Sequence, residues 1–152
     1  MKYVILLIGL VFFGCSETPI ETPIGSQDNV EVIVTFSVDM SFQIDEGNFN
    51  PNIDELFIAG NFNGWCQESC DEIIRITDDQ YDIVFTNSDN SFFQVDTELQ
   101  FKFKINEDDW ETPNPAVSNC IANEYGGYNR LYVIESGSNS LPKYWYNDES
   151  EN

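Results

Sequence analysis

Two segments of the chain alternate strictly between apolar and polar residues, and this two-residue period constrains the fold more than any other feature. Residues 30–38 place valine or phenylalanine at every second position, and residues 99–106 do the same with leucine, phenylalanine and isoleucine. Successive side chains of a β-strand point to opposite faces, so each segment predicts a strand with one buried face. No segment of useful length follows the 3.6-residue period of a helix. We therefore expect an all-β fold.

Shorter apolar runs between turn residues predict the other strands. Residues 72–77 and 81–86 flank Asp78-Asp79-Gln80 and predict a hairpin. Seven or eight short strands at regular spacing are typical of an immunoglobulin-like β-sandwich, and 41% hydrophobic residues are enough to fill one core. The complete set of expected strands is 30–38, 55–59, 72–77, 81–86, 99–106, 130–135 and 142–146.

The residues before this domain have a different composition. Lys2 is followed by an apolar run over residues 3–13 and then by Gly14-Cys15. The run is shorter than the roughly 20 residues that a membrane-spanning helix needs, and it has the organisation of a signal peptide. Gly14-Cys15 resembles the lipobox of bacterial lipoproteins, which implies lipidation of Cys15. Ordinary secretion is the alternative.

These features predict four segments. Residues 1–14 are the lipoprotein signal peptide, and residues 15–29, which contain Glu-Thr-Pro-Ile twice, are an extended tether. Residues 30–148 are the sandwich domain, and residues 149–152 are an acidic tail. We therefore expect an exported protein, anchored through lipid to the cell envelope at the outer membrane or cell surface.

Charge and the absence of histidine exclude several functions. The chain carries 27 acidic and six basic residues, a net charge of −21, so it repels the backbone of a nucleic acid. Catalytic systems that need histidine cannot be built. We expect no enzyme, no cofactor and no metal. Acidic clusters such as Glu107-Asp108-Asp109 raise a glycosidase pair or a calcium loop as alternatives, but among 27 acids such clusters arise by chance.

Three cysteines remain in the expected mature domain, Cys66, Cys70 and Cys120. An exported protein should oxidise two of them and leave one over, unless the third pairs between chains. A bridge from Cys66 to Cys70 would close a small loop, whereas a bridge from either to Cys120 would join distant loops. The spacing does not choose between these pairings.

Five short segments carry a family resemblance. They are residues 34–39, residues 56–65 (Leu-Phe-Ile-Ala-Gly-Asn-Phe-Asn-Gly-Trp), Phe101-Lys102-Phe103, Trp110-Glu111 and Asn129-Arg130. Their order and spacing resemble the starch- and glycogen-binding modules, which include carbohydrate-binding module family 48 and the glycogen-binding domain of the AMP-activated kinase β subunit. The resemblance covers residues 30–148. It departs from the family between residues 111 and 128, where Cys120 and Gly126-Gly127 are inserted.

The resemblance implies a site for α-glucan on one face of the sandwich. It assigns the two sugar-stacking tryptophans to Trp65 and Trp110, the lysine to Lys102 and the asparagine to Asn129. Tyr125 is placed where relatives have a side chain that packs on the sugar ring.

The residues support the same face without the family. A sugar ring has an apolar plane with hydroxyls at its edge, so a binder needs flat aromatic surfaces beside hydrogen-bonding groups. Trp65 ends a Gly/Asn turn and Trp110 follows an acidic run, and both settings favour exposure, with a core tryptophan as the alternative. Lys102 alternates outward, with local ion pairs as its alternative role. Asn129 either faces the sugar or satisfies a turn.

We therefore expect non-catalytic binding of α-glucan at the cell surface, in the company of a glycan-degrading enzyme or transporter. The alternative is an immunoglobulin-like protein-interaction or structural module of a cell-envelope complex, because aromatic anchors beside a cation also serve protein interfaces. Tyr144, Trp145 and Tyr146 predict a final strand with rings alternating in and out, and a secondary sugar contact is the alternative for them.

Overall fold

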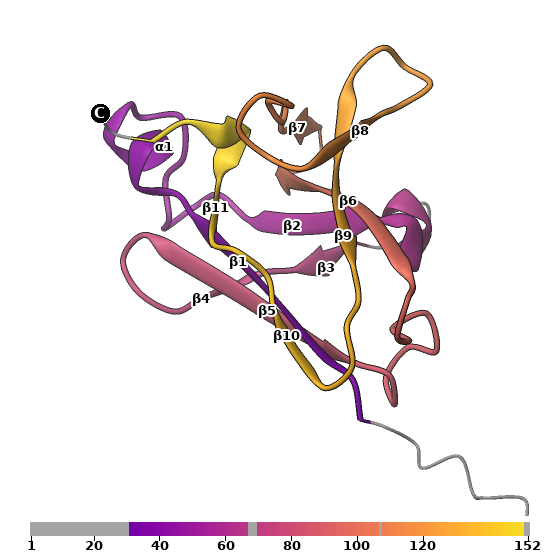
Figure 1. Cartoon of the computed structure of the whole chain (residues 1–152). Helices are drawn as coiled ribbons and strands as arrows, with labels where there is room; N and C mark the ends of the chain where they lie inside the picture. Colours follow the sequence, from indigo (N-terminus) through magenta and orange to yellow (C-terminus); the bar gives the residue numbers. More distant parts are fainter. Residues whose placement is uncertain (1–30, 67–69, 107, 151–152) are drawn as a thin grey trace, which may run out of the picture.

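The computed structural model describes residues 31–66, 70–106 and 108–150. They form two β-sheets that enclose an apolar core between them (Figure 1). The predicted all-β sandwich is confirmed. The expected signal peptide, Cys15 and the tether lie outside the described residues, and so does the end of the acidic tail. Within the described part of the chain, no helix has the length and apolarity that crossing a membrane requires.

The first sheet has five strands in the order β10-β1-β5-β4, with β11 also pairing with β1, and the second sheet has six in the order β3-β2-β6-β9-β8, with β7 pairing with β6. Pairs in the first sheet are antiparallel except for β1 with β10 and β11, which are parallel. The elements are β1 (Ile33–Asp39), α1 (Ser41–Asp45), β2 (Leu56–Gly60), η1 (Asn61–Cys66), β3 (Asp71–Glu72), β4 (Ile74–Arg75), β5 (Gln80–Thr86), β6 (Glu98–Ile105), β7 (Asp109–Trp110), β8 (Cys120–Ala122), β9 (Tyr128–Val133), β10 (Ser138–Ser140), β11 (Tyr144–Trp145) and η2 (Tyr146–Asp148).

The two alternating segments form the central strands of the two sheets. In β1 and β6 every second side chain is buried, as the two-residue period predicts. Phe36 of β1 meets Phe101 of β6 edge to face, with ring centroids 4.9 Å apart, and such a pair adds about 0.5–1.5 kcal/mol beyond the burial of its area. The outward side chains of β6, Gln100, Lys102 and Lys104, form a row on the outer face of the second sheet.

The strand expected over residues 72–77 is divided between the two sheets. β3 pairs with β2 in the second sheet, whereas β4 pairs with β5 in the first. Ile73 lies between them with its side chain buried, and its amide donates to the carbonyl of Leu56. The expected hairpin with residues 81–86 is therefore present only from Ile74. The apolar pattern continues through the change of sheet, so it gives no sign of the break.

The remaining differences from the expected strands concern short elements. α1, β7, β8 and β10 have two to five residues each, too few to show a period in the sequence. The three short strands, together with the division of residues 72–77 into β3 and β4, bring the described strands to eleven instead of the expected seven or eight. The rings of the final segment alternate as predicted: Tyr144 and Tyr146 are buried, and Trp145 between them is 36% exposed. The strand is shorter than the expected 142–146, because β11 ends at Trp145 and Tyr146 begins η2.

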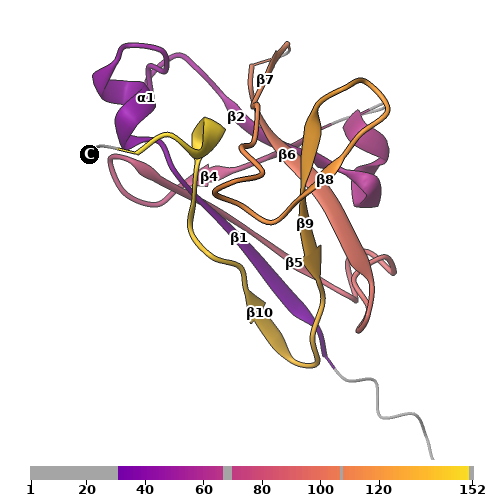
Figure 2. The ribbon, with the colours of Figure 1, turned by 45° about the horizontal axis from the view of Figure 1, so that its top comes forward.

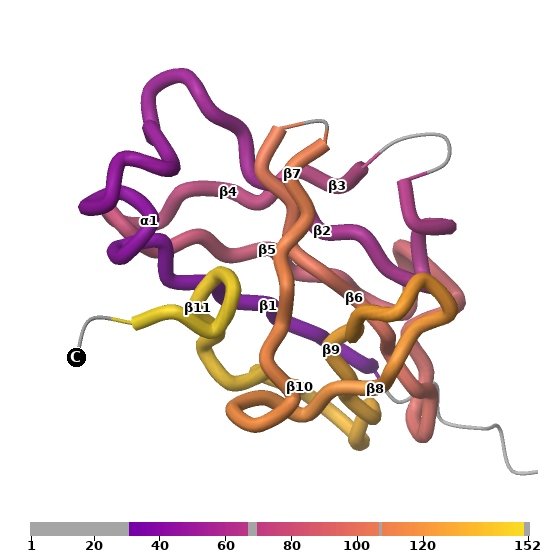
Figure 3. Tube along the Cα trace, turned by 90° about the horizontal axis from the view of Figure 1, so that it is seen from above, coloured from indigo at the N-terminus to yellow at the C-terminus, as the bar shows by residue number. Residues whose placement is uncertain are grey.

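Two turns of the second sheet lie near each other at one end of the sandwich. The β8–β9 hairpin loop and η1 approach each other over the outer face of the second sheet (Figures 2 and 3). The described chain enters β1 at the opposite end (Figure 2). Both turns therefore lie beside the outer face of the second sheet.

Candidate functional site

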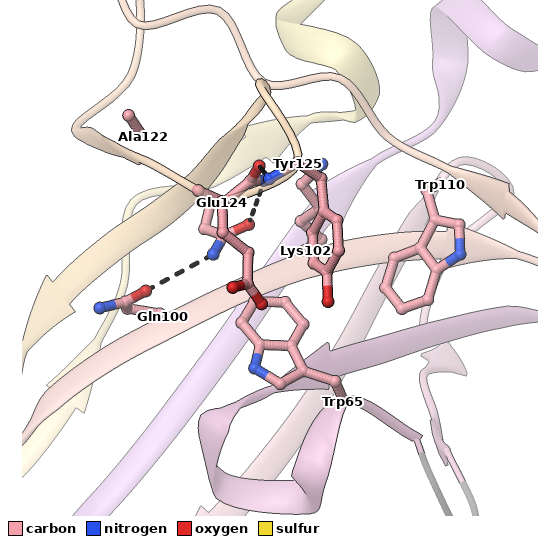
Figure 4. Close-up of a pocket in the computed structure, with 9 residues that line it drawn as sticks. Trp65, Gln100, Lys102, Trp110, Ala122, Glu124 and Tyr125 are labelled. Carbon is pink, nitrogen blue, oxygen red and sulfur yellow. Dashed lines mark hydrogen bonds between the residues drawn. The ribbon is translucent and has the colours of Figure 1, made fainter.

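A groove of about 760 Å³ lies on the outer face of the second sheet, a size within the range of small-molecule pockets. All five residues proposed from the sequence line this groove. Four further lining residues were not foreseen. The lining consists of Trp65, Gln100, Lys102, Trp110, Ala122, Asn123, Glu124, Tyr125 and Asn129 (Figure 4).

The floor of the groove follows from the register of β6 and β9. Phe101 and Arg130 are cross-strand partners whose side chains point into the sandwich. Because side chains alternate along a strand, Lys102 and Asn129 point outward, and so does Gln100, which lies on the other side of Phe101 in β6. These three polar side chains therefore share one face although they are up to 29 residues apart in the sequence.

Trp65 reaches the groove from a left-handed turn. Gly64, Trp65 and Cys66 have φ angles of 60°, 59° and 62°. For a bulky residue such as tryptophan this region is strained, at about 1–3 kcal/mol, and the strain persists only where neighbouring contacts hold it. Asn63 provides several of these contacts: its side-chain amide donates to the carbonyl of Ile58 and its side-chain oxygen accepts from the amide of Gly60.

A disulfide closes the same turn. Cys66 is bonded to Cys70, and Cys120 is a free, partly buried thiol whose pKa is raised by burial. The structure thus selects one of the pairings that the spacing left open. The two Cα atoms are 4.6 Å apart, within the range that a disulfide bridges, so the smaller loop is the one that closes. The bridge lies next to Trp65 and adds a covalent restraint to the wall of the groove.

Trp110 is held at the other side of the floor by a cation. It lies on β7 opposite Lys104 of β6, and the Lys104 ammonium is 5.0 Å from the centre of the indole ring. Trp110 is 37% exposed and Trp65 is partly buried, and neither belongs to the core cluster. The alternative that these tryptophans close the sandwich interior is therefore excluded.

Lys102 differs from the other described cations in having no partner. Arg75, Arg130 and Lys143 make ion pairs, and Lys104 packs against Trp110. Among residues 31–66, 70–106 and 108–150, no carboxylate lies within ion-pair distance of the Lys102 ammonium. Burial of this partly covered side chain lowers its pKa. Local ion pairing does not explain its position.

Asn129 connects the floor to the hairpin wall. It is 7% exposed, and its side-chain oxygen accepts from the Asn123 amide at 3.0 Å. Its own amide points to the Gln100 oxygen at 3.5 Å. Asn129 thus lines the groove, but its polar atoms are engaged with neighbouring side chains. Both contacts are with side chains, so they are not the contact with a turn backbone that the sequence alternative gave this asparagine.

The hairpin places two exposed side chains over the groove. Tyr125 is 89% exposed, and Figure 4 shows its ring pointing down toward the space between Trp65 and Trp110. A hydrogen bond with Glu124 raises the pKa of the Tyr125 phenol. No pattern in the sequence points to Glu124 or Asn123, because both lie in the inserted stretch and follow no period.

Arg130 does not contribute to the cationic character of this face. The sequence places Lys102, Lys104 and Arg130 on the two segments of the proposed site, but Arg130 is fully buried. Its guanidinium nitrogens lie 2.8 Å from a carboxylate oxygen of Glu111 and 2.7 Å from one of Asp148. The register with Phe101 turns it into the sandwich, where its guanidinium lies 4.5 Å from the ring centre of Tyr144.

No group of three or more acidic or cysteine side chains in the described residues is arranged to hold a metal ion.

No protein-family model matches the chain, and no curated protein matches it. Among solved structures, the chain is similar to the Glycoside Hydrolase Family 15 Glucoamylase from Hypocrea jecorina, with a TM-score of 0.51 and 11% sequence identity. The match covers 77% of this chain and 17% of the glucoamylase chain. At this identity the likeness concerns the fold alone, and it agrees with the two-sheet sandwich described above.

Proposed function

We propose that this chain is a non-catalytic module that binds an α-glucan of the starch or glycogen type in the groove. One observation carries the proposal: a partly buried lysine, for which the described residues provide no carboxylate partner, lies on the floor between two tryptophans that the core does not use. A chain with a net charge of −21 has many acids for pairing. A cation kept apart from them, and partly desolvated, is available to donate to a ligand.

The aromatic walls fit the apolar faces of sugar rings. Trp65 and Trp110 come from η1 and β7 and border one groove with Tyr125 above it (Figure 4). An indole offers a large flat apolar surface with one polar atom at its edge, which matches the alternation of C–H faces and hydroxyls along a glucan. The strained but well-anchored backbone of Trp65 favours a preformed wall, so that little ordering is needed on binding.

The choice of α-glucan comes from the family resemblance. The residues that it assigns lie on separate segments of the chain, and their convergence on one groove supports the assignment. The glucoamylase neighbour is named as a glycoside hydrolase, and this name agrees with a carbohydrate ligand, although the likeness itself is one of fold. A shallow, wet groove with few stacked rings leads us to expect micromolar to millimolar affinity, roughly 4–8 kcal/mol.

The location of the groove agrees with an anchored protein. We propose that the chain is exported and lipidated on Cys15 at the cell envelope. The disulfide between Cys66 and Cys70 supports export, because such bonds persist in oxidising compartments. The described chain begins at the end of the sandwich away from the hairpin (Figure 1), so an N-terminal anchor would direct the groove outward, toward polysaccharide and a glycan-degrading enzyme or transporter.

A second candidate function has an observation of its own. Three apolar side chains of the first sheet are each more than half exposed. They are Ile74 on β4, Ile76 directly after β4, and Val84 on β5. Exposed apolar residues that gather in this way mark protein interfaces in other proteins. This surface supports a protein-interaction module in a cell-envelope complex, and it belongs to the first sheet, away from the groove.

Retardation of the domain in a native gel that contains soluble starch tests the proposal. We expect the unmodified domain to be retarded, and Trp65→Ala or Trp110→Ala to lose at least about tenfold in affinity, as aromatic anchors do when truncated. Trp145→Ala is the matched control, because Trp145 is similarly exposed but does not line the groove. Absence of retardation for the unmodified domain would remove glucan binding and favour the interaction module.

A further inference from the structure

Glu124 occupies the part of the groove for which the family resemblance gives no counterpart. It lies in the connection between β8 and β9, is exposed, and lines the groove. Figure 4 shows its side chain extending from the hairpin toward Trp65 on the far wall. An acidic side chain thus reaches across the binding surface from above.

The backbone around Glu124 is fixed to the sheet. The side-chain oxygen of Asn123 accepts hydrogen bonds from the amides of Tyr125 and Gly127, each at 3.0 Å. Its side-chain amide donates to Asn129 on the floor. Gly126 has a φ of 81°, a left-handed conformation that suits glycine at the tip of the hairpin. Glu124 is therefore presented from a braced loop.

The groove needs acceptors beyond the sites that its amides have left. A sugar hydroxyl both donates and accepts, so Lys102 covers only half of what a glucan requires. The side-chain oxygens of Asn129 and Gln100 already accept hydrogen bonds inside the lining. The Glu124 carboxylate has two oxygens with several acceptor sites.

The two charges of the lining cancel. Lys102 and Glu124 are its charged residues, so the lining itself has no net charge in a chain of net charge −21. At about 0.15 M salt the Debye length is about 8 Å, so charges in the groove and directly beside it, such as Lys104 next to Trp110, act most strongly on a bound ligand. Glu124 then decides whether an anionic substituent beside it is tolerated.

We propose that Glu124 is a specificity-determining residue of the groove, which accepts hydrogen bonds from the hydroxyls of a neutral glucan and rejects glucans that carry anionic substituents. The inference rests on the proposed function and adds to it the charge class of the ligand. The discrimination against anionic glucans depends on the Glu124 carboxylate and not on the net charge of the chain.

The test compares short soluble amylose with carboxymethylated amylose of the same chain length, at about 0.15 M salt. The unmodified domain should bind the neutral chain at least about fivefold more tightly, the effect of one close like-charge contact in water. Glu124→Gln should reduce this ratio by about fivefold, and Glu124→Lys should shift it further in the same direction. Glu46→Gln, at an exposed acid after α1, makes the same change in net charge and should leave the ratio unaltered.

The outcomes separate this inference from the function on which it rests. If the unmodified domain binds neutral amylose but Glu124→Gln and Glu46→Gln give the same ratio, the role of Glu124 is overturned and glucan binding stands. If the unmodified domain binds neither polymer, both proposals fail. Lys102→Met must weaken binding of both polymers, which excludes a general gain of affinity for anions as the cause of the Glu124→Gln result.

Discussion

Lys102 and Arg130 lie on neighbouring strands of one sheet and have opposite environments. Arg130 points into the sandwich, where all five of its N–H groups find acceptors: Glu111, Asp148, Ser118 and the carbonyl of Trp145. Lys102 points outward onto the floor of the groove and has no ion-pair partner in the described chain. Arg130 is therefore paired within the fold, whereas Lys102 is the cation that the proposed function assigns to a ligand.

The difference follows from the two-residue period of a strand. A shift of one position moves a side chain from the core face to the outer face. Arg130 is the chain neighbour of Asn129, and its partner Glu111 is the neighbour of Trp110. The buried cluster therefore fixes, from beneath, two strands whose adjacent residues line the groove. The fold thus pairs Arg130 completely, whereas the described residues give Lys102 no ion-pair partner.

The largest expected effect comes from replacing the buried cation, Arg130. Arg130→Met leaves the Glu111 carboxylate, which is fully buried, without its countercharge, and loss of one partner of a buried pair destabilises by about 3–5 kcal/mol. The free energy of unfolding, measured in urea, should fall by this amount. Arg75→Met is the matched control, because Arg75 pairs with Asp78 at the surface and should change stability by under about 1 kcal/mol. Equal losses in the two variants would contradict the comparison.

The groove side of the comparison predicts a loss of binding without a loss of stability. Burial lowers the pKa of Lys102, so its charge does not stabilise the fold, and Lys102→Met should leave the free energy of unfolding within about 0.5 kcal/mol. Affinity for soluble starch should fall about tenfold, the typical effect of losing a hydrogen bond from a charged donor. Lys143→Met, outside the groove, should bind as the unmodified domain does.

The pH dependence of binding sharpens this prediction. The protonated ammonium of Lys102 donates to the ligand, so binding should be complete below its lowered pKa and should weaken as the pH rises through that value, before the ordinary 10.5 is reached. Lys102→Met should lack this loss. Parallel pH profiles for the two proteins would show that the Lys102 ammonium does not contact the ligand.

Much of this arrangement could be predicted from the sequence, because it depends on alternation. The periods over β1 and β6 fixed which side chains enter the core, and hence that Lys102 points outward. Arg130 could not be assigned in this way, since its buried partner Asp148 lies 18 residues further along the chain and only the folded structure brings them together. The braced hairpin was equally hidden, because the hydrogen bonds of Asn123 leave no pattern in the sequence.

The smallest expected effect concerns a third cation that lies between these two extremes. Lys143 is partly exposed and donates to Asp39 at 2.7 Å, where Ser41 also donates. Burial raises the pKa of Asp39, but the hydrogen bonds from Lys143 and Ser41 outweigh this and hold the pKa below its ordinary value of 3.8. At a pH between the lowered pKa and 3.8, the unfolded chain therefore binds a proton at Asp39 more readily than the native protein does. Stability from this carboxylate is present above pH 3.8 and is lost as the pH falls through the lowered pKa.

Asp39→Asn should remove this acid-dependent part, which we expect to be about 1 kcal/mol or less for a partly exposed pair. Urea unfolding of the two proteins at neutral pH and below pH 3.8 measures it: the difference in unfolding free energy should shrink on acidification. In a protein that carries Lys143→Met, the effect of Asp39→Asn on the unfolding free energy at neutral pH should be smaller but not zero, since Ser41 still donates to Asp39. A difference that stays constant at all pH values would mean that Asp39 stabilises the fold by packing and not by charge. Lys143 would then no longer stand between the buried Arg130 and the unpaired Lys102.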